Sequence, residues 1–464
     1  MKRKNSGKAR IKGKISRKTL CYYSFLALIP LSCLFLTIPL AIIIAFAMSV
    51  MCYNSYARED GEFIAKYLSV IIYLSAMQSV YLGVFISSLE RIELQVMLSI
   101  HVLYSALTLI ISIIASKRGI PWPVHLLIVE IVVSCLGFII YNPQIIAFIS
   151  SLRNLISPIM FFSLAYIFAG KIDDKTLMKK IEIVLYIVIV FGVIEYSIGN
   201  KLWIDLNITE LSIKKNLITN TYAKVPPNWY SSEKIGGHQL RRMVSTFADP
   251  VNLGTFLFAG YAVAEYERKN FLKMLTLLCI VLCVSKGAFL GILISFVVNC
   301  WYKDRSKISV PVIIGITLGL GYVFIVFSQS SSTGSMFYHV LNFIKSFGVL
   351  VTKPLGYGVG NAGVLAKVTG GTISTDIVET GFGAIVSQMG IIGLMIYVYF
   401  FGKLVAGGRL INKNDVEDKV LFYSLLFSYI ANVLFNEVAL SPNSCGIYFV
   451  LLGTKLGKQK AHMS

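Results

Sequence analysis

A pair of arginines, Arg241 and Arg242, ends a long polar segment shortly before an apolar run. Arginine stays charged, and its planar guanidinium group offers a fork of donors to phosphate oxygens. Asp249 and Pro250 follow, a pair typical of a helix N-cap and the first helical residue. The free N–H groups of a helix start also favour an anion. The segment predicts a phosphate-binding site; the alternative is that both arginines only reach lipid head groups.

A second polar segment is rich in glycine. Gly356, Gly358 and Gly360 alternate with larger residues, and glycine lets the backbone approach a ligand closely. This string lacks the strand–helix context of a dinucleotide site. Asp376 and Glu379 precede the next apolar run, where a carboxylate could take a proton from an attacking hydroxyl or simply favour the helix start.

Three charges fall within apolar runs: Glu130, Arg153 and Lys286. A charge is costly in lipid, so we expect each to face the bundle interior or a wet cavity. Arg153 stands near the predicted outer end of its run, where it could line the same cavity as Arg242. The first polar segment also carries Trp203 and Trp229, whose rings could anchor at the membrane interface or stack on sugars.

The composition places these residues in a membrane protein. Of 464 residues 56% are hydrophobic and only 14% charged, and the mean hydropathy is +0.73. The apolar runs are about 20 residues long without polar alternation, which predicts membrane-spanning helices rather than a barrel. Nine Lys/Arg in residues 2–18 explain much of the net charge of +20 and indicate a cytoplasmic flank on anionic lipid, not a nucleic-acid binder.

The apolar runs and the basic loops between them predict a topology. Thirteen runs are visible, and the run 22–52 contains Pro30 and Pro39, so we expect it to form two short helices. This gives 12–14 helices, with both termini in the cytoplasm and both polar segments outside. The predicted organisation is a basic tail (1–20), N-terminal helices (21–199), a first outer loop (200–247), central helices (248–328), a second outer loop (329–378), C-terminal helices (379–456) and a tail (457–464).

Several function classes lose support. No GxxxxGK[ST] phosphate loop and no long cytoplasmic loop are present, which argues against ATP-driven transport by this chain alone. Matching halves, the sign of an inverted-repeat transporter, are not visible. The cysteines lack CxxC spacing, and we interpret Cys279 and Cys283 as small core residues rather than metal ligands.

Three segments in order resemble the family of O-antigen polymerases and O-antigen ligases, which are integral membrane glycosyltransferases. The first is Arg242, Thr246, Phe247, Pro250, Asn252 and Gly254. The second is Ser285-Lys286-Gly287-Ala288, where Lys replaces the family's Arg. The third is Pro354–Gly360, then Glu379 and Gln388–Gly393. Glu379 stands near the position of a ligase His, which favours a polymerase.

The resemblance implies a bundle like that of GT-C membrane glycosyltransferases in the bacterial cytoplasmic membrane. It implies a polyprenyl-diphosphate-linked oligosaccharide as donor, inverting transfer to a second lipid-linked unit, and no metal, cofactor or nucleic acid. Membrane lipid, a chain-length regulator and a flippase would be partners. Arg242 would hold the leaving diphosphate and Glu379 would be the base. Candidate substrate-binding residues are Arg241, Arg153, Asn252, Gly254, Lys286, Lys353, Gly356, Gly358, Gly360 and Asp376.

The chain departs from this pattern in one respect. Polymerases often carry a second essential arginine in the second loop, and this chain has no arginine between Arg305 and Arg409. Lys345, Lys353 or Lys367 would have to replace it. A ligase-type transferase remains the nearest alternative, and a flippase or exporter of the same glycan is the alternative from another class. A lipid-facing sensor or scaffold is a third.

Overall fold

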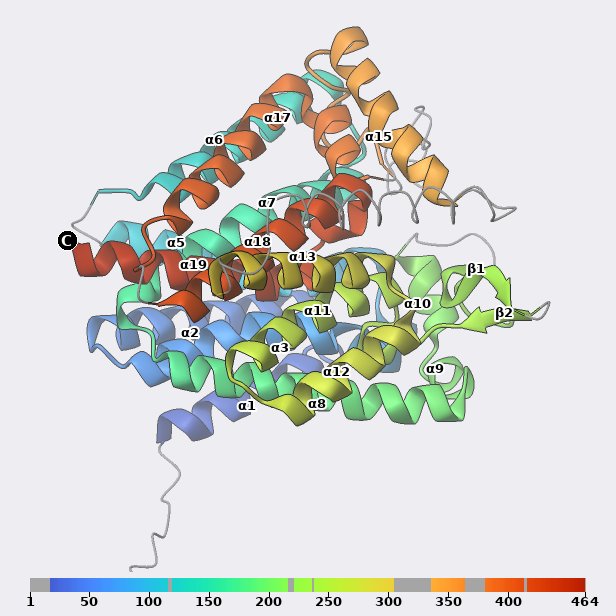
Figure 1. The fold of residues 1–464 in the computed structure, drawn as a ribbon, viewed down its shortest axis with the longest axis horizontal. Helices are drawn as coiled ribbons and strands as arrows, with labels where there is room; N and C mark the ends of the chain where they lie inside the picture. The colour runs from blue at the N-terminus through green and yellow to red at the C-terminus, as the bar shows by residue number, and fades with distance from the viewer. Residues whose placement is uncertain are drawn as a thin grey trace, which may run out of the picture.

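The structure, a computed structural model, describes residues 17–115, 119–215, 221–235, 238–303, 335–363, 380–412 and 415–463. In these ranges the chain forms a bundle of helices and one small two-stranded sheet (Figure 1). Six helices are long and apolar enough to cross a membrane. The predicted class, an all-α polytopic membrane protein, is confirmed at this level.

The N-terminal part is a series of eight α-helices. They are α1 (Arg17–Leu31), α2 (Thr37–Ala57), α3 (Gly61–Phe85), α4 (Arg91–Leu98), α5 (Ile100–Ala115), α6 (Trp122–Tyr141), α7 (Ile145–Phe168) and α8 (Asp174–Ile198), with 3-10 turns at Ile86–Ser88 and Ala169–Lys171. The apolar run 22–52 is divided between α1 and α2, so the predicted break is confirmed. Pro30 stands at the end of α1 and Pro39 in the first turn of α2, where proline is tolerated.

The remaining helices complete the bundle. They are α11 (Pro250–Tyr266), α12 (Asn270–Cys283), α13 (Lys286–Lys303), α15 (Ser335–Thr352), α17 (Gly381–Gly408), α18 (Val416–Phe435), the 3-10 helix η6 (Glu437–Leu440) and α19 (Pro442–Met463). α19 packs along α7 and also against α3 and α11, so the last helix fills the centre of the bundle. This packing buries Phe161 and Phe162 of α7, Phe258 of α11 and Tyr448 of α19.

Among the described residues, fewer helices are long and apolar enough to cross a membrane than the sequence predicts for the whole chain. The six are 37–57, 61–88, 122–141, 145–171, 174–198 and 381–408, and the bent pair α4 and α5 adds a seventh if it forms one span. Other predicted spans are helices too short or too polar for a simple crossing. α12 has 14 residues, about 21 Å at a rise of 1.5 Å, against a hydrocarbon core of about 30 Å. The predicted span 308–328 lies outside the described residues.

The segment expected as a first outer loop has a fold of its own. It contains α9 (Lys201–Asp205), α10 (Ile208–Lys214), η3 (Pro227–Trp229), the antiparallel strands β1 (Tyr230–Ile235) and β2 (His238–Arg241), and η4 (Ser245–Phe247). Trp203 and Trp229 are fully buried and pack edge to face, with ring centroids 6.1 Å apart. Their interpretation as interfacial anchors or sugar platforms is wrong, because they form this segment's core.

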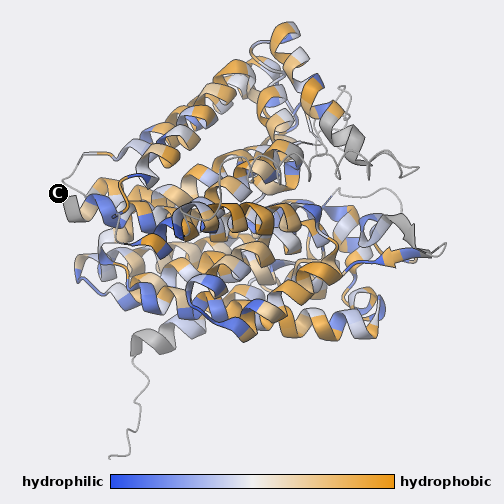
Figure 2. Cartoon of the chain, viewed as in Figure 1, coloured by the Kyte–Doolittle hydropathy of each residue, from blue (hydrophilic) through white to orange (hydrophobic). Residues whose placement is uncertain are grey.

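The segment expected as a second outer loop includes helix α15. Ile344, Phe347 and Val351 lie on one face of α15 and are exposed. Phe343 and Phe347 contact Phe382 at the start of α17. Figure 1 shows α15, α17 and α6 standing at the edge of the bundle, and Figure 2 shows that these helices consist largely of hydrophobic residues. This edge is therefore suited to lipid contact.

Ion pairs gather at one end of the bundle, the left end in Figure 1, where α19 ends. They join residues far apart in the sequence, most of them in or next to helix ends: Lys269–Glu182, Arg268–Glu417, Lys303–Glu417, Lys455–Asp418 and Lys458–Asp174. The sequence predicts that the basic segments contributing these lysines and Arg268 lie on one side of the membrane. The ion pairs place them together. β1 and β2 lie at the opposite end (Figure 1).

Candidate functional site

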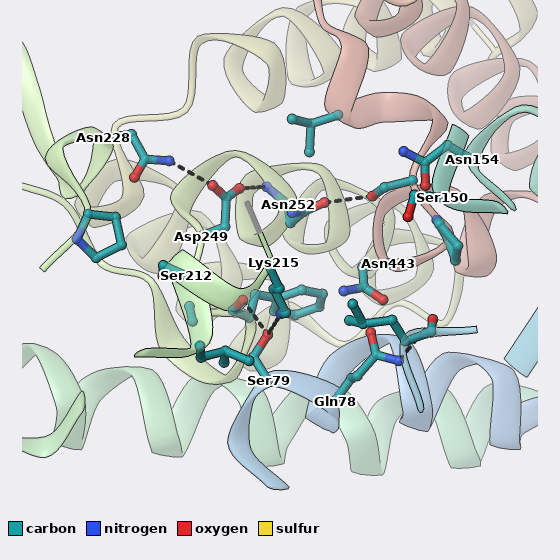
Figure 3. Close-up of a pocket in the computed structure, with 18 of the residues that line it drawn as sticks. Gln78, Ser79, Ser150, Asn154, Ser212, Lys215, Asn228, Asp249, Asn252 and Asn443 are labelled. Atoms are coloured by element: carbon teal, nitrogen blue, oxygen red, sulfur yellow. Dashed lines mark hydrogen bonds between the residues drawn. The ribbon is translucent and has the colours of Figure 1, made fainter. Parts of the chain in front are cut away.

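A polar cavity opens at the end of the bundle that holds the strands. Its volume is about 600 Å³. Its wall comes from α3, α4, α7, α10, the start of α11 and the η6–α19 turn. The polar and charged lining residues are Gln78, Ser79, Gln95, Ser150, Arg153, Asn154, Ser212, Lys215, Asn228, Asp249, Asn252, Glu437, Ser441 and Asn443. Figure 3 shows that most of these side chains are amides and hydroxyls.

Arg153 reaches the cavity from α7. The expectation that it faces the bundle interior or a wet cavity is confirmed. Its Nε and Nη1 atoms are buried and have no hydrogen-bond partner among the described residues. Pro158, four residues after Asn154 in the same helix, has no N–H for the Asn154 carbonyl. The Asn154 side-chain oxygen is also buried and without a partner in the described part of the chain.

Lys215 reaches the same cavity from the end of α10. The preceding residue, Lys214, donates to the carbonyls of Ile86 at 2.8 Å and Leu89 at 3.0 Å, which fixes the end of α10 against the turn after α3. Consecutive residues at a helix end point in different directions, so Lys215 turns inward. Its Nζ lies 3.4 Å from the Ser79 hydroxyl (Figure 3).

Asp249 caps α11, as the sequence predicts. Its Oδ1 accepts from the backbone N–H of Val251 at 3.0 Å and of Asn252 at 2.7 Å. Its Oδ2 accepts from the Asn228 amide at 2.8 Å (Figure 3). Pro250 is the first residue of the helix. The prediction of a cap followed by proline is confirmed, and both carboxylate oxygens of Asp249 are occupied.

Asn252 is the third residue of α11 and lines the cavity. Its side-chain oxygen accepts a hydrogen bond from the Ser441 hydroxyl at 3.0 Å. This bond joins the start of α11 to the turn between η6 and α19. Asn252 therefore helps to hold together two walls of the cavity.

Arg241 stands behind the cavity, in a buried ion pair. Its guanidinium group contacts the carboxylate of Glu195, and its Nε donates to the Asn200 side chain at 2.9 Å. The second oxygen of Glu195 accepts from the backbone N–H groups of Val244 at 3.3 Å and Ser245 at 3.2 Å. This network fastens the strand β2 and the chain after it to the end of α8.

Arg242 also has protein partners for its donors. Nε donates to the Cys283 carbonyl at 3.0 Å, Nη1 to the Asn228 carbonyl at 3.2 Å and Nη2 to the Val284 carbonyl at 3.3 Å. Arg242 does not line the cavity, but Asn228 does. Arg242, which the resemblance assigns to the leaving diphosphate, therefore lies behind the cavity wall and holds the wall residue Asn228 in position.

Replacing Arg242 tests this positioning role. We expect Arg242→Met to lower the free energy of unfolding by about 2–4 kcal/mol, because three carbonyls lose a charged donor. Arg242→Lys should recover less than half of the loss, since one ammonium cannot reach carbonyls on three sides. The measurement is thermal unfolding of the purified protein in detergent. Equal melting temperatures for wild type and Arg242→Met would show that these bonds do not stabilise the fold.

The second segment of the family resemblance meets the first. The αL residue Val284 and then Ser285 separate α12 from α13. A Cβ on Gly254 would lie 2.1 Å from the Ser285 hydroxyl oxygen, so only glycine fits there. Lys286 begins α13 with its side chain exposed and does not line the cavity. The first two segments of the family resemblance therefore pack against each other, through Gly254 and Ser285, outside the cavity wall.

The backbone of the glycine-rich segment packs closely against other parts of the protein. α17 is interrupted at Gly390, and the backbone of 354–358 fills the break: Tyr357 N–H donates to the Ser387 carbonyl at 2.7 Å and Gly358 N–H to the Gln388 carbonyl at 3.1 Å. Gly356, Gly358 and Gly360 all have positive φ. They lie against Gln388, Tyr141 and Phe148 and are not part of the cavity wall.

The remaining predicted site residues lie elsewhere. Lys353 follows the end of α15 with its side chain exposed. Asp376 and Glu379 lie outside the described residues. Of the predicted set, the structure brings Arg153 and Asn252 to the cavity. Sequence reasoning missed Lys215 and the amides Gln78, Gln95 and Asn154, because single polar residues in apolar helices form no motif.

Comparison with protein-family models finds none that matches the chain, and a search of curated proteins finds no match. The chain is a multi-pass membrane protein, and the cavity is a candidate site by its lining.

Proposed function

We propose that the chain is a polysaccharide polymerase that joins polyprenyl-diphosphate-linked oligosaccharide units at the cavity end of the bundle. The observation that carries this proposal is the lining of the cavity. Amides and hydroxyls from at least four helices line a cavity at the end of an apolar bundle. Such groups both donate and accept hydrogen bonds, as sugar hydroxyls do. The sequence resemblance to membrane glycan polymerases and ligases supports the same function.

The proposed reaction is one inverting transfer. A hydroxyl of the acceptor glycan attacks the anomeric carbon of the donor, the bond from that carbon to the diphosphate breaks, and the hydroxyl proton passes to a base. Negative charge develops on the leaving diphosphate, so fixed cations at the site lower the barrier. In this proposal Glu379 is the base, and the reaction uses no metal, cofactor or nucleotide sugar.

The proposal also places the protein in its membrane. The ion-paired end, with its basic loops and both termini, faces the cytoplasm by the positive-inside rule. The cavity then faces outward, in a bacterial cytoplasmic membrane, where lipid-linked glycans are the available donors. A GT-C-like architecture with 12–14 crossings belongs to this proposal, as do a chain-length regulator and a flippase as partners.

The length distribution of the surface glycan tests the function. Cells that lack the protein should display single repeat units, and restoring the wild-type chain should restore a ladder of longer glycans. Asn154→Leu removes a cavity amide whose oxygen is buried without a partner among the described residues. We expect it to reduce long glycan at least tenfold. Gln459→Leu, in α19 near the ion-paired end, is the matched control and should leave the ladder intact.

Other functions give other results. Deletion of a flippase would trap single units inside the cell, and deletion of a ligase would leave long glycan on its lipid carrier. Either result contradicts polymerisation by this chain. A ladder that is unchanged in Asn154→Leu would show that the cavity does not hold the glycan.

A further inference from the structure

Neither cation of the cavity, Arg153 or Lys215, forms an ion pair with a carboxylate in the described part of the chain. Arg153 buries its Nε and Nη1 without an acceptor there. A buried charge without a hydrogen-bonding partner is costly, and arginine and lysine are rarely buried unless paired. This cost suggests that a ligand completes the site.

The two side chains act on each other. Burial lowers the pKa of the Lys215 amine from 10.5 to about 8, and the positive charge of Arg153 lowers it further, whereas Asp249 opposes the shift. Ser79 is the hydrogen-bond partner of Lys215, at 3.4 Å. Like charges that approach within one cavity repel, and an anion between them would reverse the sign of the interaction.

The neighbouring carboxylates do not supply that anion. Asp249 uses both oxygens to cap α11 and to hold Asn228. Glu437, at the start of η6, lines the same cavity but forms no ion pair with Arg153 or Lys215 in the described part of the chain. On Lys215's own helix, Glu210 pairs with Lys214, and Lys214 points to the turn after α3. The charge of the two cations is left for a ligand.

We propose that Arg153 and Lys215 form a two-cation site that binds the diphosphate group of the cavity's ligand. A diphosphate has oxygens on two phosphorus atoms, so it can meet a cation from α7 and another from α10 together. Arginine provides the planar fork and lysine a point charge. That this diphosphate carries a lipid-linked glycan rests on the proposed function, while diphosphate binding does not. Arg242 positions the wall through Asn228 and does not contact the anion.

Binding by purified full-length protein in nanodiscs tests the site. The probes are inorganic diphosphate, a prenyl diphosphate, and nanodiscs with or without anionic phospholipid. We expect both diphosphates to bind, and Arg153→Gln or Lys215→Gln to weaken each at least tenfold. The matched controls, Arg91→Gln and Lys201→Gln, replace exposed cations and should bind as wild type. Stabilisation by anionic phospholipid alone, or equal affinity in the cavity variants and wild type, overturns the proposal.

The stability of the same variants separates binding from a structural role. Without ligand, Arg153→Gln and Lys215→Gln should melt at or above the wild-type temperature, because each removes repulsion between two cations of one cavity. A structural cation would give a lower melting temperature instead, and loss of binding with that result would overturn the assignment. Either variant alone suffices, so one that fails to fold leaves the other as the test.

The pH dependence identifies Lys215. Its pKa of about 8 lies below the ordinary 10.5, so the unliganded protein should gain stability as pH rises from 8 to 10.5. Diphosphate affinity should change in the opposite sense: it is highest below pH 7 and falls between pH 7 and 9.5 as the amine loses its proton. Lys215→Gln should abolish this fall, and Arg153→Gln should retain it. An equal fall in Lys215→Gln and wild type overturns the role of Lys215.

Failure of this site and failure of the proposed function give different results. If diphosphate binding requires both cations but deletion of the protein leaves glycan length unchanged, the diphosphate site is supported and the polymerase function is contradicted. If the glycan ladder requires the protein but is unaffected by Arg153→Gln and Lys215→Gln, the polymerase function is supported and the diphosphate site is contradicted.

Discussion

Arg241→Met should destabilise the protein more than any other single change in the segment 200–247. The side chain of Glu195 is fully buried, and Arg241 supplies its positive partner. Removing one member of a buried ion pair leaves the other charge without compensation and costs about 3–5 kcal/mol. We expect a large fall in the melting temperature of the detergent-solubilised protein, together with release of β2 from the end of α8.

The reverse change should be milder. Glu195→Gln removes the charge from the more deeply buried member, and Arg241 keeps its bond to Asn200 and its place over the Tyr196 ring. In the double variant Arg241→Met with Glu195→Gln, no buried charge remains, so its loss of stability should be smaller than the sum of the two single losses. A strictly additive double variant would show that the two side chains do not interact.

Sequence reasoning succeeded where one residue type imposes one local geometry. Asp249 followed by Pro250 predicts a helix start, because the carboxylate satisfies free N–H groups and proline needs none. The prolines at 30 and 39 predict a divided helix for the same chemical reason. Basic loops predict a common side of the membrane, and the ion pairs at one end of the bundle agree with that grouping.

The hairpin of β1 and β2 was missed although its signal is in the sequence. Tyr230–Ile235 and His238–Arg241 are separated by Gly236-Gly237, a two-residue connection typical of β-hairpins. The charge of this segment indicates an outer loop, whereas its turn residues indicate a hairpin. Recognising the hairpin would have placed Arg241 in a strand, where its side chain must pack against a neighbouring element.

The partners of Arg241 and Arg242 could not be predicted. Two adjacent arginines look alike in a sequence, but one meets a carboxylate from α8 and the other meets carbonyls from the end of α12. These contacts join positions about 40 residues apart. Lys215 was hidden for the same reason, since its significance depends on Arg153 from a different helix. Residue type shows which bonds a side chain can form, and tertiary packing decides which ones it does form.

The glycines of the sequence motifs pack against other helices of the bundle. Gly254 packs on Ser285, and the glycine-rich segment packs on the interruption of α17 at Gly390. Both contacts lie outside the cavity wall. The short motifs that carry the family resemblance therefore include residues that hold helices in place around the cavity. Activity lost in a motif variant has to be separated from loss of fold before a catalytic role is assigned.

Gly360→Ala is the second change with a large expected effect. Gly360 has a φ of +91°, and a Cβ there would lie 2.7 Å from the backbone nitrogen and 2.8 Å from the Cα of Phe148. Backbone cannot move aside as a flexible side chain can, and a positive φ adds strain of about 1–3 kcal/mol. Phe148 stands at the start of α7, which carries Arg153. We expect a loss of at least about 3 kcal/mol of stability and a displaced cavity wall.

Gly348→Ala is the matched control for this change. Gly348 lies inside α15 with nothing within 4 Å of its would-be Cβ, so alanine should be neutral or should stabilise the helix by up to about 1 kcal/mol. Melting temperatures of the two variants in detergent give the comparison, and diphosphate binding gives the consequence for Arg153. If Gly360→Ala melts like Gly348→Ala, the glycine-rich segment does not pack against α7 as described, and its glycines become free to serve a ligand instead.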